Sequence, residues 1–402
     1  MAANCAPPPE LSNSCVSTYG CGNPREHTFG QGCLIGYRQE ESQHATRRFL
    51  LDRCAQLNRL AKGTLMRILL VCLMGLGDVA SILVPAAYLY RERYPEASIT
   101  ALTYEAGEEI MQLHPEVDDV MAISKAQWPD DLMSAVQQFM QLGESIAAQQ
   151  FDLIVNLDTW FMPCFMTRAL RDTGFNIEGN YLNQGVESFL KTAVAGEIAQ
   201  TFFERPGEYM ESTFPRMAMW HRPWWQKAPE TSYPDFYLKT CCDFDHDVRI
   251  ELPCEQDQAL LSEANGKPIV ALSTRGRAGY KHYQHSDELV SILEGNAIFC
   301  WSQFDGSVPM RTTLNRLHAS KLLVTVPTST QWLGRLAGCP SLMLPGPMSP
   351  TLLGAEFFAP QRTNCQYCYH EKECPEKRDF ECMDSEPKAL ADQVLTILGE
   401  SQ

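Results

Sequence analysis

The distribution of apolar residues from Met66 onward predicts alternating strands and helices. Short apolar runs are separated by longer stretches in which apolar residues recur at helical spacing. We expect strands at 67–74, 98–104, 114–123 and 151–158, an amphipathic helix at 78–95 and a long helix at 131–150. Because strands joined through helices run parallel and need cover on both faces, the pattern indicates an α/β fold with a doubly wound parallel sheet.

A second block of the same kind begins near Lys267. Its predicted parts are the apolar segments within 268–283 and 297–303, a strand at 321–326, a helix from about Thr330 and a strand at 341–345. Gly338, Cys339 and Pro340 end that helix. Two doubly wound halves with a connector near 250–265 would enclose a ligand cleft, so we expect domains at 66–255 and 256–402.

Two segments depart from this alternation. Residues 1–65 mix Pro, Ser, Asn and Gly with four scattered cysteines. From this composition we expect the segment to be a mobile extension, or to be untranslated if Met66 is the true start. Residues 197–235 carry Trp220, Trp224 and Trp225 among prolines. They form either a packed connector, which we favour, or an aromatic rim for an acceptor.

Composition narrows the class of partner. The formal net charge of −16 argues against nucleic acid, since binding a phosphate backbone needs clustered Lys and Arg. Asp78 interrupts the longest apolar stretch, and the first residues lack a basic region followed by an apolar one. The 16 cysteines, several of them within apolar strands, suit a reducing compartment. We therefore expect a soluble cytoplasmic protein that binds small ligands.

The loop after the first strand reads Gly75-Leu76-Gly77-Asp78. Its glycines resemble a dinucleotide fingerprint, and Glu105 after the second strand could hold a ribose. However, a carboxylate beside the second glycine would repel a pyrophosphate. Asp78 therefore fits better as a general base facing a cleft, while capping of the helix at 79–93 is an equally weighted alternative.

Two further segments suggest binding chemistry. Thr328, Ser329 and Thr330 stand where a helix is expected to begin, so their N–H groups and hydroxyls either face a diphosphate or cap the helix. Near the C-terminus, four cysteines in the spacing C-x2-C-x5-C-x7-C could surround one tetrahedral ion: Cys365, Cys368, Cys374 and Cys382. Zinc and iron both suit four sulfurs, and such a filled site is structural; two disulfides or free thiols are the alternatives.

The motifs taken together resemble glycosyltransferase family 9, the ADP-heptose:lipopolysaccharide heptosyltransferases. The resemblance covers roughly 66–395 and rests on these segments in order: "RILLVCLMGLGD", "RYPEASITALT", "HPEVDDV", "FDLIVNLD", the unit at 321–347 and "CQYCYHEKECPEKRDFECM". It implies the GT-B architecture, in which two Rossmann-like domains face a central cleft. It also implies an inverting sugar transfer in which Asp78 takes the proton of the acceptor hydroxyl.

The resemblance assigns further donor-binding roles. Ser273 and Thr274, with Lys281 behind them, resemble the family's phosphate-contacting loop, and Gly75 and Gly77 lie in the donor-side loop. Lys281 would neutralise charge on the departing ADP without a catalytic metal. Arg275 and Arg277 are rivals for that role.

One segment departs from the family pattern. Where the family usually reads N-D-T-G-x-x-H, this chain has Pro327, Ser329 and Trp332 in place of the acid, the glycine and the histidine. A subset, the bacterial autotransporter heptosyltransferases, shows a similar segment and is associated with iron at such a cysteine cluster. The acceptor is therefore a lipopolysaccharide core glycan or a protein, and the donor expected from the family is ADP-heptose.

Two other functions stay open at this stage. A Rossmann NAD-dependent oxidoreductase would use Gly75, Gly77 and Glu105, and a non-catalytic, metal-stapled GT-B scaffold would explain the altered segment at 326–332. Attachment to the periphery of the inner membrane and assembly into a homo-oligomer also stay open.

Overall fold

The structure is a computed structural model that describes residues 65–124, 132–221, 230–276, 281–359, 365, 367–370 and 373–400. These residues belong to one compact unit, Thr64–Gln402. Several predictions fall outside the described residues: those for 1–64, for Trp224 and Trp225, and for Arg277.

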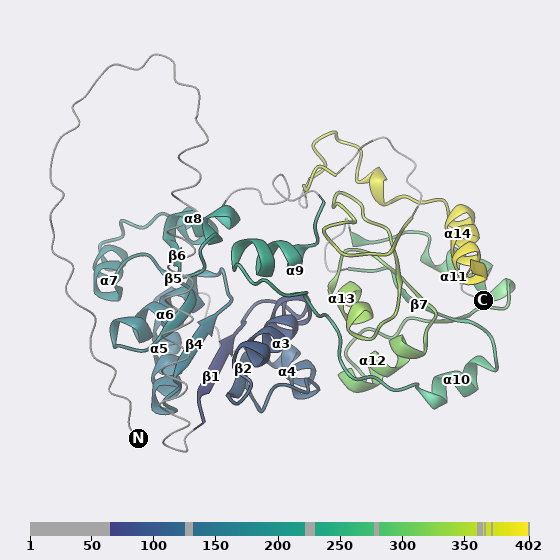
Figure 1. Cartoon of the computed structure of the whole chain (residues 1–402). Helices are drawn as coiled ribbons and strands as arrows, with labels where there is room; N and C mark the ends of the chain where they lie inside the picture. Colours follow the sequence, from purple (N-terminus) through teal and green to yellow (C-terminus); the bar gives the residue numbers. More distant parts are fainter. Residues whose placement is uncertain are drawn as a thin grey trace, which may run out of the picture. The chain divides into compact units, whose positions relative to one another are not determined.

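The first half is built on a six-stranded sheet with the order β3-β2-β1-β4-β5-β6. Figure 1 shows β1 between β2 and β4. Five strands are parallel, and β6 runs antiparallel to β5. The strands are β1 (Arg67–Val71), β2 (Ser98–Tyr104), β3 (Asp119–Ile123), β4 (Leu153–Asn156), β5 (Ile177–Leu182) and β6 (Met210–Ser212). This is the order of a doubly wound dinucleotide-type sheet, and the four predicted strands are confirmed.

The second half is built on a five-stranded parallel sheet with the order β11-β10-β9-β7-β8. The strands are β7 (Ile269–Ser273), β8 (Phe299–Trp301), β9 (Leu322–Thr325), β10 (Ser341–Met343) and β11 (Phe357–Phe358). On one face of this sheet α11 and α14 lie side by side (Figure 1). The two sheets confirm the predicted pair of doubly wound α/β halves.

Helices connect these strands. Those of the first half are α2 (Leu76–Asp78), α3 (Val84–Arg93), α4 (Glu105–Gln112), α5 (Leu132–Ala148), α6 (Phe161–Asp172), α7 (Val186–Val194), α8 (Pro206–Tyr209) and α9 (Tyr233–Asp235). Those of the second half are α10 (Gln258–Ala264), α11 (Ser286–Gly295), α12 (Met310–Ala319), α13 (Ser329–Leu336) and α14 (Pro387–Glu400). The described residues also form two π-helical turns, η1 (Val79–Leu83) and η6 (Phe236–Cys241), and three 3₁₀ turns, η3 (Gln200–Glu204), η4 (Met217–His221) and η8 (Glu381–Met383).

The inner strands of both sheets are buried on both faces, as the unbroken apolar runs predict, whereas β3 and β11 at the sheet edges are partly exposed. Along β1, Ile68 and Leu70 face one core cluster, while Leu69 and Val71 face another. Burying such side chains stabilises the fold by about 1.5–3 kcal/mol each.

The predicted amphipathic helix at 78–95 is wrong in two respects. It is interrupted by the π-helical turn η1, and residues 84–90 of α3 are all buried. Pro85 has no N–H to donate one turn back, and the longer i→i+5 bond from the N–H of Val84 to the carbonyl of Val79 precedes it.

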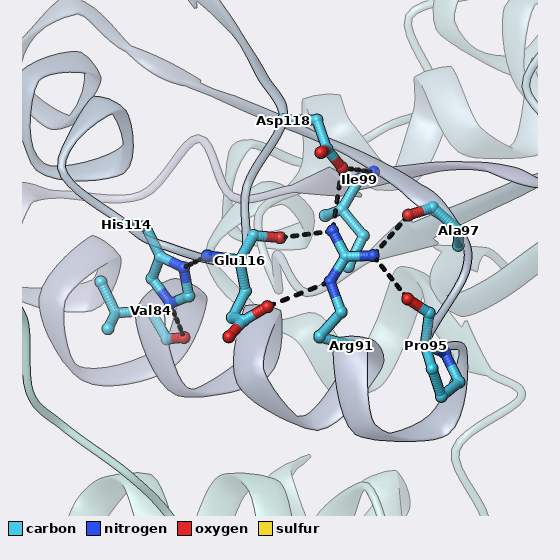
Figure 2. A network of polar contacts seen from close by, with 8 residues as sticks. All are labelled: Val84, Arg91, Pro95, Ala97, Ile99, His114, Glu116 and Asp118. Carbon is cyan, nitrogen blue, oxygen red and sulfur yellow. Dashed lines mark hydrogen bonds and ion pairs between the residues drawn. The ribbon is translucent and has the colours of Figure 1, made fainter.

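A polar network fastens α3 to the strands that follow it (Figure 2). The Arg91 guanidinium pairs with the carboxylates of Glu116 and Asp118. It also donates to the backbone carbonyls of Pro95, Ala97 and Glu116. Beside it, the buried His114 ring joins the carbonyl of Val84 to the N–H of Glu116. The network fixes the end of α3, which is joined through η1 to the short helix α2 that carries Asp78.

The connector contributes to this packing. Trp220 is half-buried and its ring lies 5.2–6.3 Å from the rings of Tyr233, Phe236 and Tyr237. For Trp220, the packed-connector prediction is therefore confirmed.

Candidate functional site

The order of the strands indicates where a ligand would bind. In open α/β sheets, ligands occupy the crevice at the carboxyl ends of the strands, where the strand order reverses. In the first sheet this point lies between β1 and β4, which are followed by Asp78 and Asp158. In the second sheet it lies between β7 and β9, which are followed by Thr274 and Thr328. The predicted site residues thus occupy both reversal points.

Asp78 lies in the first turn of the helix and does not cap it. Gly75 is the N-cap residue with extended backbone (φ −73°, ψ 169°), and the Asp78 side chain makes no capping hydrogen bond. The capping alternative is therefore wrong. Instead, the Tyr233 hydroxyl donates to Oδ1 of Asp78 over 2.9 Å. Burial raises the pKa of Asp78 above its ordinary value, opposed by the Tyr233 hydroxyl and the Gly75 N–H, which suits a group that must accept a proton.

A second acid, Asp158, lies near Asp78 and was given no role from the sequence. It is fully buried, and its Oδ2 accepts the Leu73 N–H over 2.6 Å. Its Oδ1 has no partner among the described residues. Burial raises its pKa to about 8, with a further contribution from the charge of Asp78. An acid directly after an apolar strand was the available signal for it.

The loop that carries Asp78 contacts the start of α13. A Cβ placed on Gly77 would lie 3.6 Å from the Cα of Ser329 and 3.4 Å from Cδ1 of Trp332. The helix begins at Ser329, with Thr328 as its N-cap. The structure thus brings together the two segments on which the predicted site depends.

Polar atoms at the start of α13 lack partners. The Thr328 hydroxyl and both amide atoms of the fully buried Gln331 have none among the described residues. Thr330 is engaged, because its hydroxyl accepts from that of Ser273 over 3.0 Å. Buried polar groups without partners are rare, so these atoms point to a polar ligand. Sequence reasoning missed Gln331, whose burial depends on tertiary packing.

A cavity of about 460 Å³ opens beside the end of β7. It is lined by Leu272, Ser273, Thr274, Arg275, Ser286, Asp287, Val290, Ser302, Gln303, Phe304 and Asp305. The Thr274 hydroxyl accepts from that of Ser286 over 2.8 Å. The volume lies in the range of small-ligand pockets. Three of the predicted residues, Ser273, Thr274 and the rival cation Arg275, therefore line it.

Lys281 lies next to the start of α13 through Gly276. The Gly276 N–H donates to the Lys281 carbonyl over 2.6 Å. A Cβ on Gly276 would lie 2.6 Å from the Cβ of Lys281 and 3.0 Å from Cγ2 of Thr328. This close approach places the predicted lysine beside the predicted phosphate-binding segment.

The four predicted metal ligands are all half-buried. Burial and the charges of the other three thiolates raise the pKa of Cys382 to about 11. Backbone N–H groups of Arg378, Glu376 and Phe380 lower the pKa of Cys374. Four sulfurs are a donor set for a soft cation, but in the described part of the chain no three acidic, His or Cys side chains are gathered as ligands of an ion.

No family model and no curated protein matches the sequence. Among solved structures, a family 9 glycosyltransferase from Veillonella parvula aligns with a TM-score of 0.56 and 15% identity, over 83% of this chain and 98% of that one. The chain shares the fold of that glycosyltransferase. The E. coli ADP-heptose lipopolysaccharide heptosyltransferase II aligns with a TM-score of 0.52 and 12% identity, over 84% of this chain and 99% of that one.

These likenesses confirm the predicted GT-B architecture and, at the level of fold, the resemblance to family 9. The resemblance to the autotransporter subset stays a prediction. Within the segments described, no helix combines the length and the apolar character needed to cross a bilayer.

Proposed function

We propose that the protein is an inverting glycosyltransferase that moves a sugar from a nucleoside diphosphate to a hydroxyl acceptor. One observation carries the proposal: the loop bearing Asp78 contacts the start of α13 through Gly77 and Ser329. The proposed base and the proposed phosphate-binding helix start are thus adjacent. Attack on an anomeric carbon with departure of a diphosphate needs those two groups close together.

The donor would bind to the second half. Backbone N–H groups at the start of α13 favour negative charge. The Thr328 hydroxyl and the Gln331 amide, which have no partner in the described part of the chain, would supply further polar contacts. The cavity beside Ser273 and Thr274 has room for a nucleoside. Lys281 adds positive charge near Thr328. The family resemblance makes ADP-heptose the donor in this proposal.

The chemistry then follows from Asp78. Its carboxylate removes the proton of the acceptor hydroxyl, and the oxygen attacks the anomeric carbon from the side opposite the diphosphate. The carbon–oxygen bond to the diphosphate breaks, and the nucleoside diphosphate leaves with the electron pair, so the configuration inverts. Lys281 and the N–H groups of α13 stabilise the leaving group, and the proposal needs no catalytic metal. The acceptor is a lipopolysaccharide core glycan or a protein.

The proposal includes a structural ion, iron or zinc, held by Cys365, Cys368, Cys374 and Cys382. It rests on the C-x2-C pair, the number of sulfurs and their half-buried placement. Four sulfurs occupy all four coordination positions of a tetrahedral ion, which leaves none for a substrate. The ion would therefore stabilise the chain after β11 and take no part in sugar transfer.

Asp78→Asn tests the mechanism, because the amide keeps an oxygen that can accept from Tyr233 but cannot take a proton. We expect turnover, measured as release of ADP, to fall about a hundredfold to ten-thousandfold, while donor binding persists. Asp172→Asn, which removes an exposed partner of Arg168, is the control. Normal turnover in Asp78→Asn would refute the mechanism.

A thermal-shift panel with ADP-heptose, ADP, UDP-sugars, GDP-sugars and NAD separates the functions. A ligand at 100 times its dissociation constant stabilises the folded state by about 2.7 kcal/mol. A shift with NAD alone would favour the oxidoreductase, and a flat panel would favour the non-catalytic scaffold.

A further inference from the structure

Tyr233 contacts three separate parts of the site. Its hydroxyl donates to Oδ1 of Asp78 over 2.9 Å, and its backbone N–H donates to the carbonyl of Leu352 over 2.8 Å. Its ring lies 6.5 Å from that of Trp332 on α13. Ser232, the N-cap residue of α9, holds the turn from which Tyr233 projects. One residue thus joins the acid of the first half to the phosphate-side helix of the second.

The two carboxylate oxygens of Asp78 have different surroundings. Oδ1 accepts from Tyr233, whereas Oδ2 lies 3.6 Å from the position that a Cβ on Gly75 would take. Gly75 is exposed and adds no side chain beside Oδ2, while its N–H favours the charged carboxylate and lowers the pKa of Asp78. A carboxylate fixed through one oxygen can present the other in a constant direction.

We propose that Tyr233 is the positioning residue of the base. It fixes the Asp78 carboxylate through Oδ1 so that Oδ2 faces the acceptor, and it connects the position of this carboxylate to α13. The inference rests on the proposed function. Tyr233 itself touches no reacting atom; it acts through Asp78. A change in the Tyr233 hydroxyl should therefore alter the proton affinity of the base more than the binding of the donor.

Other titratable groups near Asp78 come from the ends of β1 and β4. Burial, with a smaller contribution from the charge of Asp78, raises the pKa of both Cys72 and Asp158, and each of these side chains is fully buried. The Tyr233 hydroxyl acts in the opposite sense on Asp78, because its hydrogen bond favours the charged carboxylate and lowers that pKa. Loss of the hydroxyl would therefore raise the pKa of Asp78.

Tyr237 offers a matched control. It lies one helical turn after Tyr233, is fully buried, and donates to the carbonyl of Leu157 over 2.5 Å while accepting from the Asn180 amide over 3.1 Å. Its hydroxyl has a structural role, since its hydrogen bonds join it to Leu157 and Asn180 and not to Asp78. Tyr237→Phe thus removes a comparable buried hydroxyl without releasing the base.

The experiment compares Tyr233→Phe with Tyr237→Phe by two measurements. The first is a titration of the Asp78 carboxyl by NMR in protein with ¹³C-labelled aspartate, assigned with Asp78→Asn. The second is the pH profile of ADP release. We expect Tyr233→Phe to raise the pKa of Asp78, to shift the acid limb of kcat to higher pH and to lower kcat about tenfold at neutral pH with an unchanged KM for the donor. Tyr237→Phe should leave both pH dependences in place.

The outcomes separate the inference from the function on which it rests. An unchanged Asp78 titration in Tyr233→Phe, or an equal change in Tyr237→Phe, would overturn the inference. A raised pKa of Asp78 confined to Tyr233→Phe supports the link between the two residues, even where the parent protein turns over no sugar nucleotide. Absence of turnover in the parent protein would refute the proposed function and leave the link without a catalytic role.

Discussion

Protonation of His114 should destabilise the protein at mildly acidic pH. The imidazole is 3% exposed, and its two nitrogens lie 3.0 Å from the Val84 carbonyl and 3.1 Å from the Glu116 nitrogen (Figure 2). The Glu116 N–H donates to Nδ1, which assigns the proton of the neutral ring to Nε2, where it bonds the carbonyl. Burial lowers the pKa of His114 from 6.5 to about 4, because a charged ring would lose its hydration.

The sign and the size of the effect follow from this pKa. Below pH 6.5 the unfolded chain binds a proton at His114, whereas the folded protein binds it only near pH 4. The unfolded state thus takes up more protons in this window, and the free energy of unfolding falls as the pH falls from 6.5 to 4. At about 1.4 kcal/mol per pKa unit, the loss amounts to about 3 kcal/mol.

Urea unfolding followed by circular dichroism across this pH range measures the loss. His114→Gln should lower stability at neutral pH, because it removes buried contacts, but should flatten the pH dependence by about 3 kcal/mol relative to the parent. His246→Gln, at a histidine whose side chain is 61% exposed, should follow the parent. Carboxylates also titrate in this range, so the quantity to compare is the difference between the variant and the parent in the pH dependence of the unfolding free energy. Parallel curves for His114→Gln and the parent would refute the reasoning.

Two further predictions concern binding. Gly276→Ala would place a Cβ 2.6 Å from the Cβ of Lys281 and 3.0 Å from Cγ2 of Thr328, so the loop must shift. We expect the Kd for ADP to rise about tenfold. Gly295→Ala, whose Cβ would meet nothing within 4 Å, is the control. An unchanged Kd in Gly276→Ala would contradict the placement of Lys281. Elemental analysis should find about one iron or zinc ion per chain, lowered in Cys368→Ser, and a metal-free parent protein would exclude the proposed ion.

The sequence predicts most of the fold because burial on both faces leaves a clear pattern. Strands such as β1 and β7 read as unbroken apolar runs, and their order follows from helical crossovers of ordinary length. The helix after β1 was less predictable. Its π-helical turn depends on Pro85, and its complete burial depends on neighbours distant in the chain. Periodicity alone does not record those neighbours.

The site divides in a similar way. Asp78 and Thr328 could be found locally, since each stands in the segment between a strand and the next helix, at the carboxyl end of that strand. Tyr233 could not, because it stands 155 residues from its partner in a segment without regular pattern. Gln331 is equally hidden, since a glutamine in a helix is usually exposed. The contacts that join the two halves depend on packing between residues distant in the chain, which local motifs do not record.

The segment at 326–332, which departs from the family pattern at three positions, packs against the loop that carries Asp78. Trp332 stands where the family pattern has histidine, and it is 6% exposed, close to Gly77 and to Tyr233. Its indole lies next to the loop that carries Asp78, and a Cβ at position 77 would be in ordinary van der Waals contact with it at 3.4 Å. Gly77 and Trp332 therefore lie side by side where this loop meets the start of α13. The tryptophan at this position contributes packing between the two segments, so in the proposed mechanism the proton transfer is left to Asp78.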